Sequence, residues 1–229
     1  MTSSTLHILA MLFMLVDHIG AILYPQHIFL RCIGRLAFPI YAFMIVQGVK
    51  HTRNLKSYIL RMFGFALIAE VPFDLMLSNN YFNPAQQNVL WTFLISIACI
   101  CVLNYLKDTG FYYYVAVPAV CYLGYMLGAI CKADYKGAGI LMVLVFYLFD
   151  EKSPSHYLIQ LILLYLINGK LMKSFLIPMF GWTIPIQALA VVSLMFIWLY
   201  NGKKGIKNRS FQYFCYAFYP LHMLILWLI

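Results

Sequence analysis

Apolar residues dominate this chain in nine runs that short polar segments separate. The runs lie near positions 5–24, 29–49, 57–77, 88–106, 112–131, 138–149, 157–168, 175–200 and 210–229. A helix needs about 20 apolar residues to cross the hydrocarbon core of a bilayer, and most of the runs approach that length. The pattern predicts an all-α, polytopic bundle in a membrane, with about nine transmembrane helices and a range of eight to ten.

Three of the runs depart from a regular spanning helix. The sixth and seventh are short, so we expect tilted or re-entrant segments there. The eighth contains Pro178, Gly181 and Pro185, and a proline frees a backbone carbonyl and kinks a membrane helix. We therefore expect the eighth run to be broken. No polar linker or charge block interrupts the series, which predicts a single domain over residues 1–229.

The composition excludes a water-soluble fold. Hydrophobic residues make up 64% of the chain and charged residues 10%, against roughly a quarter in soluble domains. The formal net charge is +9, but the basic residues lie in short clusters between apolar runs. We expect membrane lipids, and no nucleic acid, as partners. The six cysteines show no CxxC or Cys/His spacing, so neither a metal site nor a disulfide framework is predicted.

The basic clusters predict the orientation in the membrane. The segment after the second run holds Lys50, Arg53 and Lys56, and the segment before the last holds Lys203, Lys204, Lys207 and Arg209. With nine spans both fall on one side, together with Lys107 and Lys152. The positive-inside rule then places the N-terminus in the cytoplasm and the C-terminus outside. Lys132, Lys136, Lys170 and Lys173 lie outside in this topology and count against it.

Ionisable residues inside the runs are the candidates for function, because a charge in hydrocarbon is costly. With the topology above they share one depth, in the outer half of the membrane. They are Asp17 and His18 in the first run, Arg31 and Arg35 in the second, Glu70 and Asp74 in the third, and His222 in the last. We expect them to converge on the bundle interior or on a wet cavity.

Two of these groups are pairs of residues that lie four positions apart, so the two members of each pair share one helical face. Arg31 and Arg35 form one pair, and Glu70 and Asp74 form the other, with Pro72 loosening the helix between them. One interpretation is a structural clamp in which the arginines neutralise the acids. The other is a substrate site, in which an incompletely neutralised arginine pair binds an anion such as a phosphate.

Asp17 and His18 are adjacent and point about 100° apart on a helix, so each needs a partner on another helix. An imidazole exchanges protons near neutral pH, which makes His18 a candidate general base. The alternative is a histidine that only hydrogen-bonds across the bundle. His222 follows Tyr219 in the final run. For His222 a packing or capping role and a role in the site are both open.

Further polar residues fall near the expected mouth of the site. Asn88 begins the fourth run, and Asp134 lies in the segment before the sixth. We interpret their neighbours Trp91 and Tyr135 as interfacial aromatics.

At these residues the chain resembles the TraX family, named for the conjugal transfer protein that acetylates the N-terminus of pilin. The motifs that carry the resemblance are Leu15-Val16-Asp17-His18-Ile19-Gly20, Arg31-Cys32-Ile33-Gly34-Arg35-Leu36-Ala37-Phe38-Pro39-Ile40, Gln47-Gly48, Glu70-Val71-Pro72-Phe73-Asp74, Gln87-Asn88-Val89, Tyr200-Asn201-Gly202 and Phe218-Tyr219-Pro220-Leu221-His222. Several ordered motifs over nearly the whole chain make a specific signal.

The resemblance implies a transmembrane acyltransferase of the bacterial plasma membrane that uses acetyl-CoA. The acceptor stays open between a peptide amine, a sugar and a lipid. In the corresponding mechanism His18 is the base or the carrier of the acetyl group, and Asp17 orients or charge-balances a neighbour, with Arg31 and Arg35 as the candidates. Arg31 and Arg35 stabilise the oxyanion or hold a phosphate of the donor. Glu70, Asp74, Asn88, Tyr219 and His222 belong to a substrate-binding or charge network.

Two other classes of protein fit part of the pattern. Acids, arginines and a histidine inside a membrane also describe the relay of a proton-coupled transporter. Against that class, the chain shows no repeated halves. A non-catalytic scaffold for a secreted peptide would not need acids and arginines at one depth.

Overall fold

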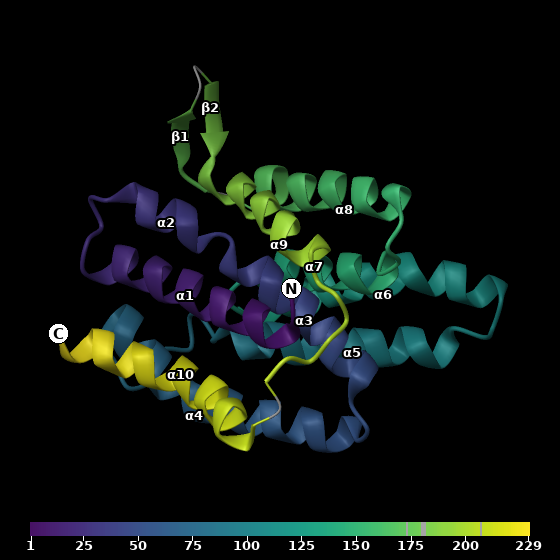
Figure 1. The fold of residues 1–229 in the computed structure, drawn as a ribbon, viewed down its shortest axis with the longest axis horizontal. Helices are drawn as coiled ribbons and strands as arrows, with labels where there is room; N and C mark the ends of the chain where they lie inside the picture. The colour runs from purple at the N-terminus through teal and green to yellow at the C-terminus, as the bar shows by residue number, and fades with distance from the viewer. Residues whose placement is uncertain (173, 180–181, 207) are drawn as a thin grey trace.

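The computed structural model describes residues 1–172, 174–179, 182–206 and 208–229, and its elements are predominantly helical (Figure 1). The helices of the first half are α1 (Ser3–Ile22), α2 (Ile28–Gly34), α3 (Ala37–His51), α4 (Leu55–Ser78), α5 (Val89–Leu106) and α6 (Phe111–Ile130). They are followed by α7 (Lys136–Leu148), α8 (Pro154–Leu166), a π-helical turn (Ile167–Leu171), β1 (Leu176–Met179), β2 (Trp182–Pro185), a 3₁₀ helix (Ile186–Ser193), α9 (Leu194–Trp198) and α10 (Arg209–Leu228). The all-α prediction is confirmed, apart from one hairpin.

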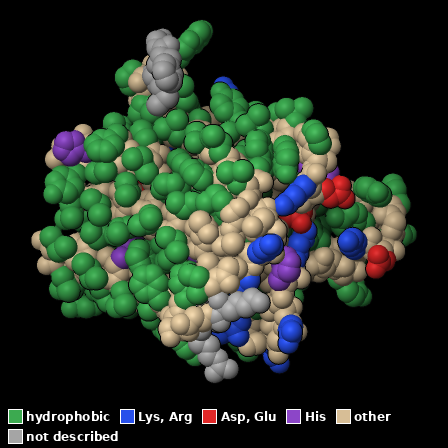
Figure 2. All heavy atoms as spheres, in the orientation of Figure 1, with side chains coloured by type: hydrophobic (Ala, Val, Ile, Leu, Met, Phe, Trp, Pro, Cys, Tyr) green, Lys and Arg blue, Asp and Glu red, His purple; other side chains and the backbone are tan. Residues whose placement is uncertain are grey.

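The surface of the bundle is apolar, as a bilayer requires. Tyr105, Ile130 and Leu228 are 86%, 70% and 74% exposed, and hydrophobic side chains cover most of the face in Figure 2. Four helical stretches, Ser3–Ile22, Ile28–His51, Val89–Leu106 and Phe111–Ile130, are long and apolar enough to cross a membrane. The protein is therefore a membrane protein, and the count of about nine spans stays a prediction.

Two predicted runs are not continuous helices. The second is divided into α2 and α3 by a turn at Arg35 and Leu36. The break expected in the run 175–200 is present: a β-hairpin, a 3₁₀ helix and the short α9 take the place of one continuous helix. In the hairpin Leu176 pairs with Pro185. The physical reason is proline, which loses a hydrogen bond inside a helix but is tolerated where a short sheet has a free edge.

The core lies where α3, α5 and α7 pack together. Phe43 meets Phe146 with ring centroids 5.8 Å apart, and Phe38 stacks on Phe93 at 5.6 Å. A glycine lets α6 approach the start of α7 closely, since a Cβ added at Gly128 would lie 2.7 Å from the backbone oxygen of Lys136. This rigid centre holds the outer helices α1, α4 and α10 in place.

The two ends of the bundle differ in charge. At one end, which we call the basic end, the Ser3 amide donates to the Lys203 carbonyl at 2.9 Å, and Lys50 pairs with Asp150. Lys and Arg side chains gather toward one side of the face in Figure 2. At the other end, the loop end, the loops 79–88 and 131–135 join, and the Gln87 amide donates to the Lys132 carbonyl at 2.9 Å. The last turns of α1 and α4 point toward the loop end.

Candidate functional site

A buried carboxylate between two guanidinium groups forms the first part of the site. Asp17 is 9% exposed. Arg31 Nη1 donates to Asp17 Oδ2 at 2.8 Å and to the Asp17 carbonyl at 2.9 Å, while Arg35 Nη2 donates to Oδ1. Two cations on one ionised carboxylate leave a net positive charge. Such a site suits an anion or a developing oxyanion.

The close approach of α1 and α2 depends on a glycine in the motif that carries the arginines. A Cβ added at Gly34 would lie 2.1 Å from Asp17 Oδ1 and 2.2 Å from its Cβ. No larger residue fits there without displacing the carboxylate. The helix break after Gly34 then lets Arg35 turn its side chain back toward Asp17.

We expect Gly34→Ala to lower the stability of the protein and to disturb the ion pairs. Overpacking a tight site costs about 1–3 kcal/mol, which thermal unfolding in detergent would detect. The matched control is Gly64→Ala in α4, because a Cβ there meets nothing within 4 Å and alanine favours a helix. A Gly34→Ala protein as stable as Gly64→Ala would contradict the close packing.

A pair of histidines from the first and last helices forms the second part. His18 Nδ1 lies 2.7 Å from His222 Nε2, and His222 Nδ1 lies 2.8 Å from the Phe218 carbonyl oxygen. A carbonyl only accepts, so His222 carries its proton on Nδ1. With both rings neutral, His222 Nε2 accepts from His18 Nδ1–H. The lone pair of His18 then sits on Nε2, for which the described residues supply no hydrogen bond.

This chain of hydrogen bonds separates the roles of the two histidines. His222 fixes the tautomer and the ring orientation of His18, in the manner of the third group in other acid–base sites. His18 Nε2 is left as the basic atom. The expectation that Asp17 and His18 find partners on different helices is confirmed by these contacts, while their catalytic roles stay predictions.

Glu70 forms a third, separate part with residues at the start of α5. Glu70 Oε2 accepts from Asn88 Nδ2 and, at 3.0 Å, from Trp91 Nε1. Asn88 is fully buried, and its Nδ2 also donates to the Ala66 carbonyl at 2.8 Å. Glu70 Oε1 is buried and has no hydrogen-bond partner in the described structure. Such an oxygen can accept a hydrogen bond from a ligand.

These contacts correct one interpretation made from the sequence. The clamp between the arginine pair and Glu70 or Asp74 is wrong, because both arginines pair with Asp17. Asp74 instead accepts the Asn83 amide at 2.7 Å and holds the loop after α4.

The two aromatics that we interpret as interfacial also make contacts inside the protein. Trp91 donates to Glu70, and Tyr135 stacks on the buried Phe38 with ring centroids 3.7 Å apart. Both side chains are held by contacts inside the protein, which their residue type alone did not show.

One polar residue near the arginines was not predicted. Gln187 is 3% exposed, and its Oε1 accepts from Arg35 Nη1 at 3.1 Å. Its Nε2 donates to Asn168 Oδ1 at 3.3 Å. The signal was a glutamine inside an apolar run directly after the Pro185 break.

Asp134 closes the site from the loop end. Its Oδ1 accepts from Gln86 Nε2 at 2.8 Å, and the carboxyl interacts electrostatically with Arg35 and Asp17. Burial is the main cause that raises the pKa of Asp134 to about 6. The loop is fixed by two residues with positive φ, Lys132 at 52° and Lys136 at 49°, a conformation that costs energy outside glycine.

The raised pKa predicts a pH-dependent contribution of Asp134 to stability. The folded protein holds this proton more tightly than the unfolded chain, so the contribution is fully present below the ordinary carboxyl pKa of 3.8 and is lost as the pH rises through about 6. The thermal midpoint of the native protein relative to Asp134→Asn should fall between pH 4.5 and pH 7.5. A constant difference over that window would rule out the raised pKa.

Comparison with known proteins bears on the same residues. A family model described as TraX protein matches residues 2–229. The chain belongs to the TraX family. Along its length it is similar to the "Probable fimbrial assembly protein FimC, serogroup H1" of Dichelobacter nodosus, with 25% identity over 96% of this chain and 92% of that protein. No solved structure matches.

The contacts of this TraX-family chain join motifs that lie far apart in the sequence. Asp17 and His18 belong to one motif, Arg31 and Arg35 to a second, and His222 to the last, and all meet through the contacts above. Glu70 and Asn88, from two further motifs, pair with each other.

Proposed function

We propose that this TraX-family protein is a membrane-embedded acyltransferase that moves an acetyl group from acetyl-CoA to an amine or hydroxyl acceptor. The observation that carries the proposal is the Phe218–His222–His18 hydrogen-bond chain. It leaves one imidazole nitrogen with a free lone pair beside a positively charged ion-pair cluster. A positioned base and a cationic group are the two components that acyl transfer needs.

In the proposed mechanism His18 Nε2 takes the proton of the acceptor as its nitrogen or oxygen attacks the acetyl carbonyl carbon. Arg31 and Arg35 stabilise the negative charge that develops on the carbonyl oxygen, since Asp17 neutralises only one of them. The carbon–sulfur bond to coenzyme A then breaks, and the leaving thiolate receives the proton from His18. The acceptor leaves acetylated, and the imidazole returns to its neutral state.

Glu70 supports the same proposal as a contact for the acceptor. Its free Oε1 accepts a hydrogen bond, while Asn88 and Trp91 hold Oε2. An amine or hydroxyl is a donor of the required kind. We therefore assign Glu70 to acceptor binding and Asn88 to its support.

The two ends of the bundle suggest which substrate enters from which side. Phosphates of acetyl-CoA favour the basic end, around Lys50, Arg53, Lys56, Lys203 and Lys204, which the positive-inside rule places in the cytoplasm. The loop end would then face outward and receive the acceptor. A transporter needs polar groups along its whole path, whereas the contacts of the two histidines and two arginines of the candidate site lie toward the loop end.

The test is transfer of isotopically labelled acetyl from acetyl-CoA by the purified protein in nanodiscs. Three probes separate the acceptor classes: a peptide with a free N-terminal amine, the same peptide with a formylated N-terminus, and glucosamine. Label on any of them, above protein-free nanodiscs, supports the proposal, and the pattern identifies the acceptor group. Absence of acetyl-CoA binding together with absence of transfer would contradict it.

A further inference from the structure

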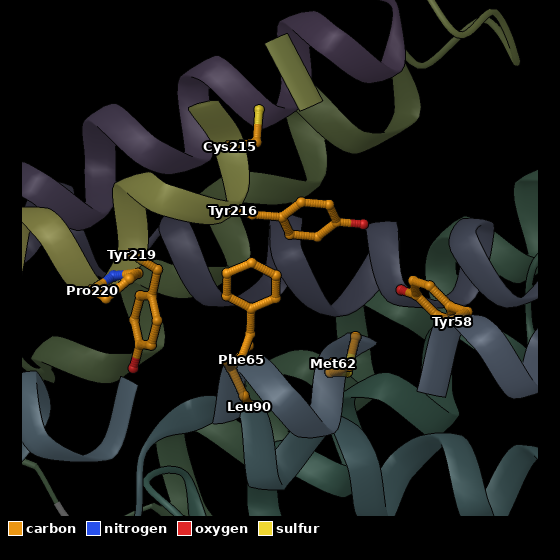
Figure 3. Close-up of a pocket in the computed structure, with 8 residues that line it drawn as sticks. All are labelled: Tyr58, Met62, Phe65, Leu90, Cys215, Tyr216, Tyr219 and Pro220. Atoms are coloured by element: carbon orange, nitrogen blue, oxygen red, sulfur yellow. The ribbon is translucent and has the colours of Figure 1, made fainter. Parts of the chain in front are cut away.

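A narrow cleft between α4 and α10 is not used by the contacts described so far. Its volume is about 80 Å³. Figure 3 shows the residues that line it: Tyr58, Met62, Phe65, Leu90, Cys215, Tyr216, Tyr219 and Pro220. All are apolar or aromatic, and no charged side chain is among them. The cleft therefore suits a slender uncharged chain rather than an ionic group.

The first end of the cleft lies toward the basic end of the bundle. Tyr58 is in the first turn of α4, between the exposed Lys56 and Arg61. Tyr58, Met62 and Phe65 recur at spacings of four and three residues, so they line one face of α4. A phosphate held by the exposed cations would thus sit where this face begins.

The second end lies next to the histidine pair. Tyr219 and Pro220 of α10 line the cleft, and Tyr219 packs against His222 with ring centroids 5.9 Å apart. His222 in turn contacts His18. Leu90 lines the cleft from α5, and its backbone N–H donates to Oδ1 of Asn88. The cleft thus leads from exposed cations to the residues of the proposed site.

We infer that the α4–α10 cleft carries the arm of acetyl-CoA, with its phosphates at the basic end and the acetyl thioester directed toward His222 and His18. This inference rests on the proposed function and adds a route for the donor. The arm of coenzyme A is an uncharged chain with two amides, which matches a lining of carbon and tyrosine hydroxyls. The charged head matches Lys56 and Arg61.

The experiment measures the alkylation rate of a cysteine placed in the cleft. Met62→Cys puts a thiol among the lining residues, and Leu67→Cys is the matched control on the same helix, at a position that is 52% exposed. Each variant is treated with N-ethylmaleimide in nanodiscs, and labelling is followed by mass spectrometry of the peptide. Acetyl-CoA at about ten times its dissociation constant should slow Met62→Cys about tenfold and leave Leu67→Cys unchanged.

Two further ligands identify what protects the thiol. Adenosine 3′,5′-bisphosphate, which has head phosphates but no arm, should leave both rates unchanged. Nanodiscs of phosphatidylglycerol and of phosphatidylcholine should give the same rate without acetyl-CoA. Protection by phosphatidylglycerol alone, equal to that by acetyl-CoA, would make the cleft a lipid site and overturn the inference.

The outcomes keep the route and the activity apart. Acetyl transfer without protection of Met62→Cys overturns the route and leaves the proposed function standing. Loss of both acetyl-CoA binding and transfer overturns the proposed function itself. Should Met62→Cys not fold, Leu90→Cys, which lines the same cleft from α5, gives the same reading.

Discussion

Replacing His18 with alanine should lower kcat for acetyl transfer by about 10²- to 10⁴-fold, the range that a positioned acid–base group contributes. The reason is that no other described nitrogen has both a fixed tautomer and a free lone pair at this site. The measurement is labelled acetyl transfer at saturating acetyl-CoA. The KM for acetyl-CoA should change little, because His18 does not hold the donor's phosphates.

His7 provides the matched control for His18. It lies on the same helix, near the basic end, and its Nδ1 contacts the Ser3 carbonyl at 3.1 Å. His7→Ala should keep kcat within about twofold, because His7 is part-buried at the basic end and lies away from the chemistry. If His18→Ala retains full transfer, the assignment of the base is wrong, whatever the effect of His7→Ala.

His222 should behave as a positioning residue. His222→Gln keeps a side chain that can hydrogen-bond to His18 Nδ1, whereas His222→Ala does not. We expect a smaller loss of kcat for the glutamine variant than for alanine, together with a shifted pH profile of kcat in both. Equal loss in the two variants with an unchanged pH profile would indicate a structural role only.

The second large effect concerns stability. Asp17→Ala removes the only carboxylate that pairs with Arg31 and Arg35 among the described residues and leaves two cations in a part-buried site. Breaking a buried ion pair in this way costs about 3–5 kcal/mol. The measurement is the midpoint of unfolding in detergent, with retention of the monodisperse peak as a check of folding.

Asp150→Ala is the matched control, because it also removes a carboxylate from an ion pair but does so outside the candidate site. Asp150 pairs with Lys50 at the basic end, where the side chains are 24% and 36% exposed, and an exposed pair contributes about 0–1 kcal/mol. A second test adds Arg31→Met to Asp17→Ala. The double variant should be more stable than the sum of the single effects predicts, because it removes one unpaired cation. Additive losses would show that Arg31 is not coupled to Asp17.

The helices of the first half could be predicted from the sequence because apolar runs of spanning length leave few alternatives in a membrane. The boundaries of α1, α5 and α6 lie close to the predicted runs. The region from 175 to 200 could not be predicted in this way. Its residues are apolar throughout, so hydropathy does not distinguish a broken helix from a hairpin, and only the pairing of Leu176 with Pro185 decides it.

The candidate residues could be selected from the sequence, which left the partner of the arginines open between Asp17 and the acids of α4. The cost of a charge in hydrocarbon singles out Asp17, the arginines and Glu70. Which acid meets the arginines depends on the close approach of α1 to α2 at Gly34. Residue spacing within one helix does not predict a contact between two helices. The free nitrogen of His18 follows from the tautomer of His222, which the Phe218 carbonyl fixes. This inference needs the packing of α10 against α1, which the sequence does not give.

The meeting of α1 with α10 has a consequence for biosynthesis. Asp17 finds its arginines within 18 residues of sequence, so that ion pair can form as soon as the second helix leaves the ribosome. His18 and His222 are 204 residues apart, and α10 is synthesised after α1 to α9. A nascent chain that has inserted α1 to α9 therefore has Asp17 paired with its arginines while His18 still lacks its contact with His222, so any activity that depends on this contact begins only after α10 has docked.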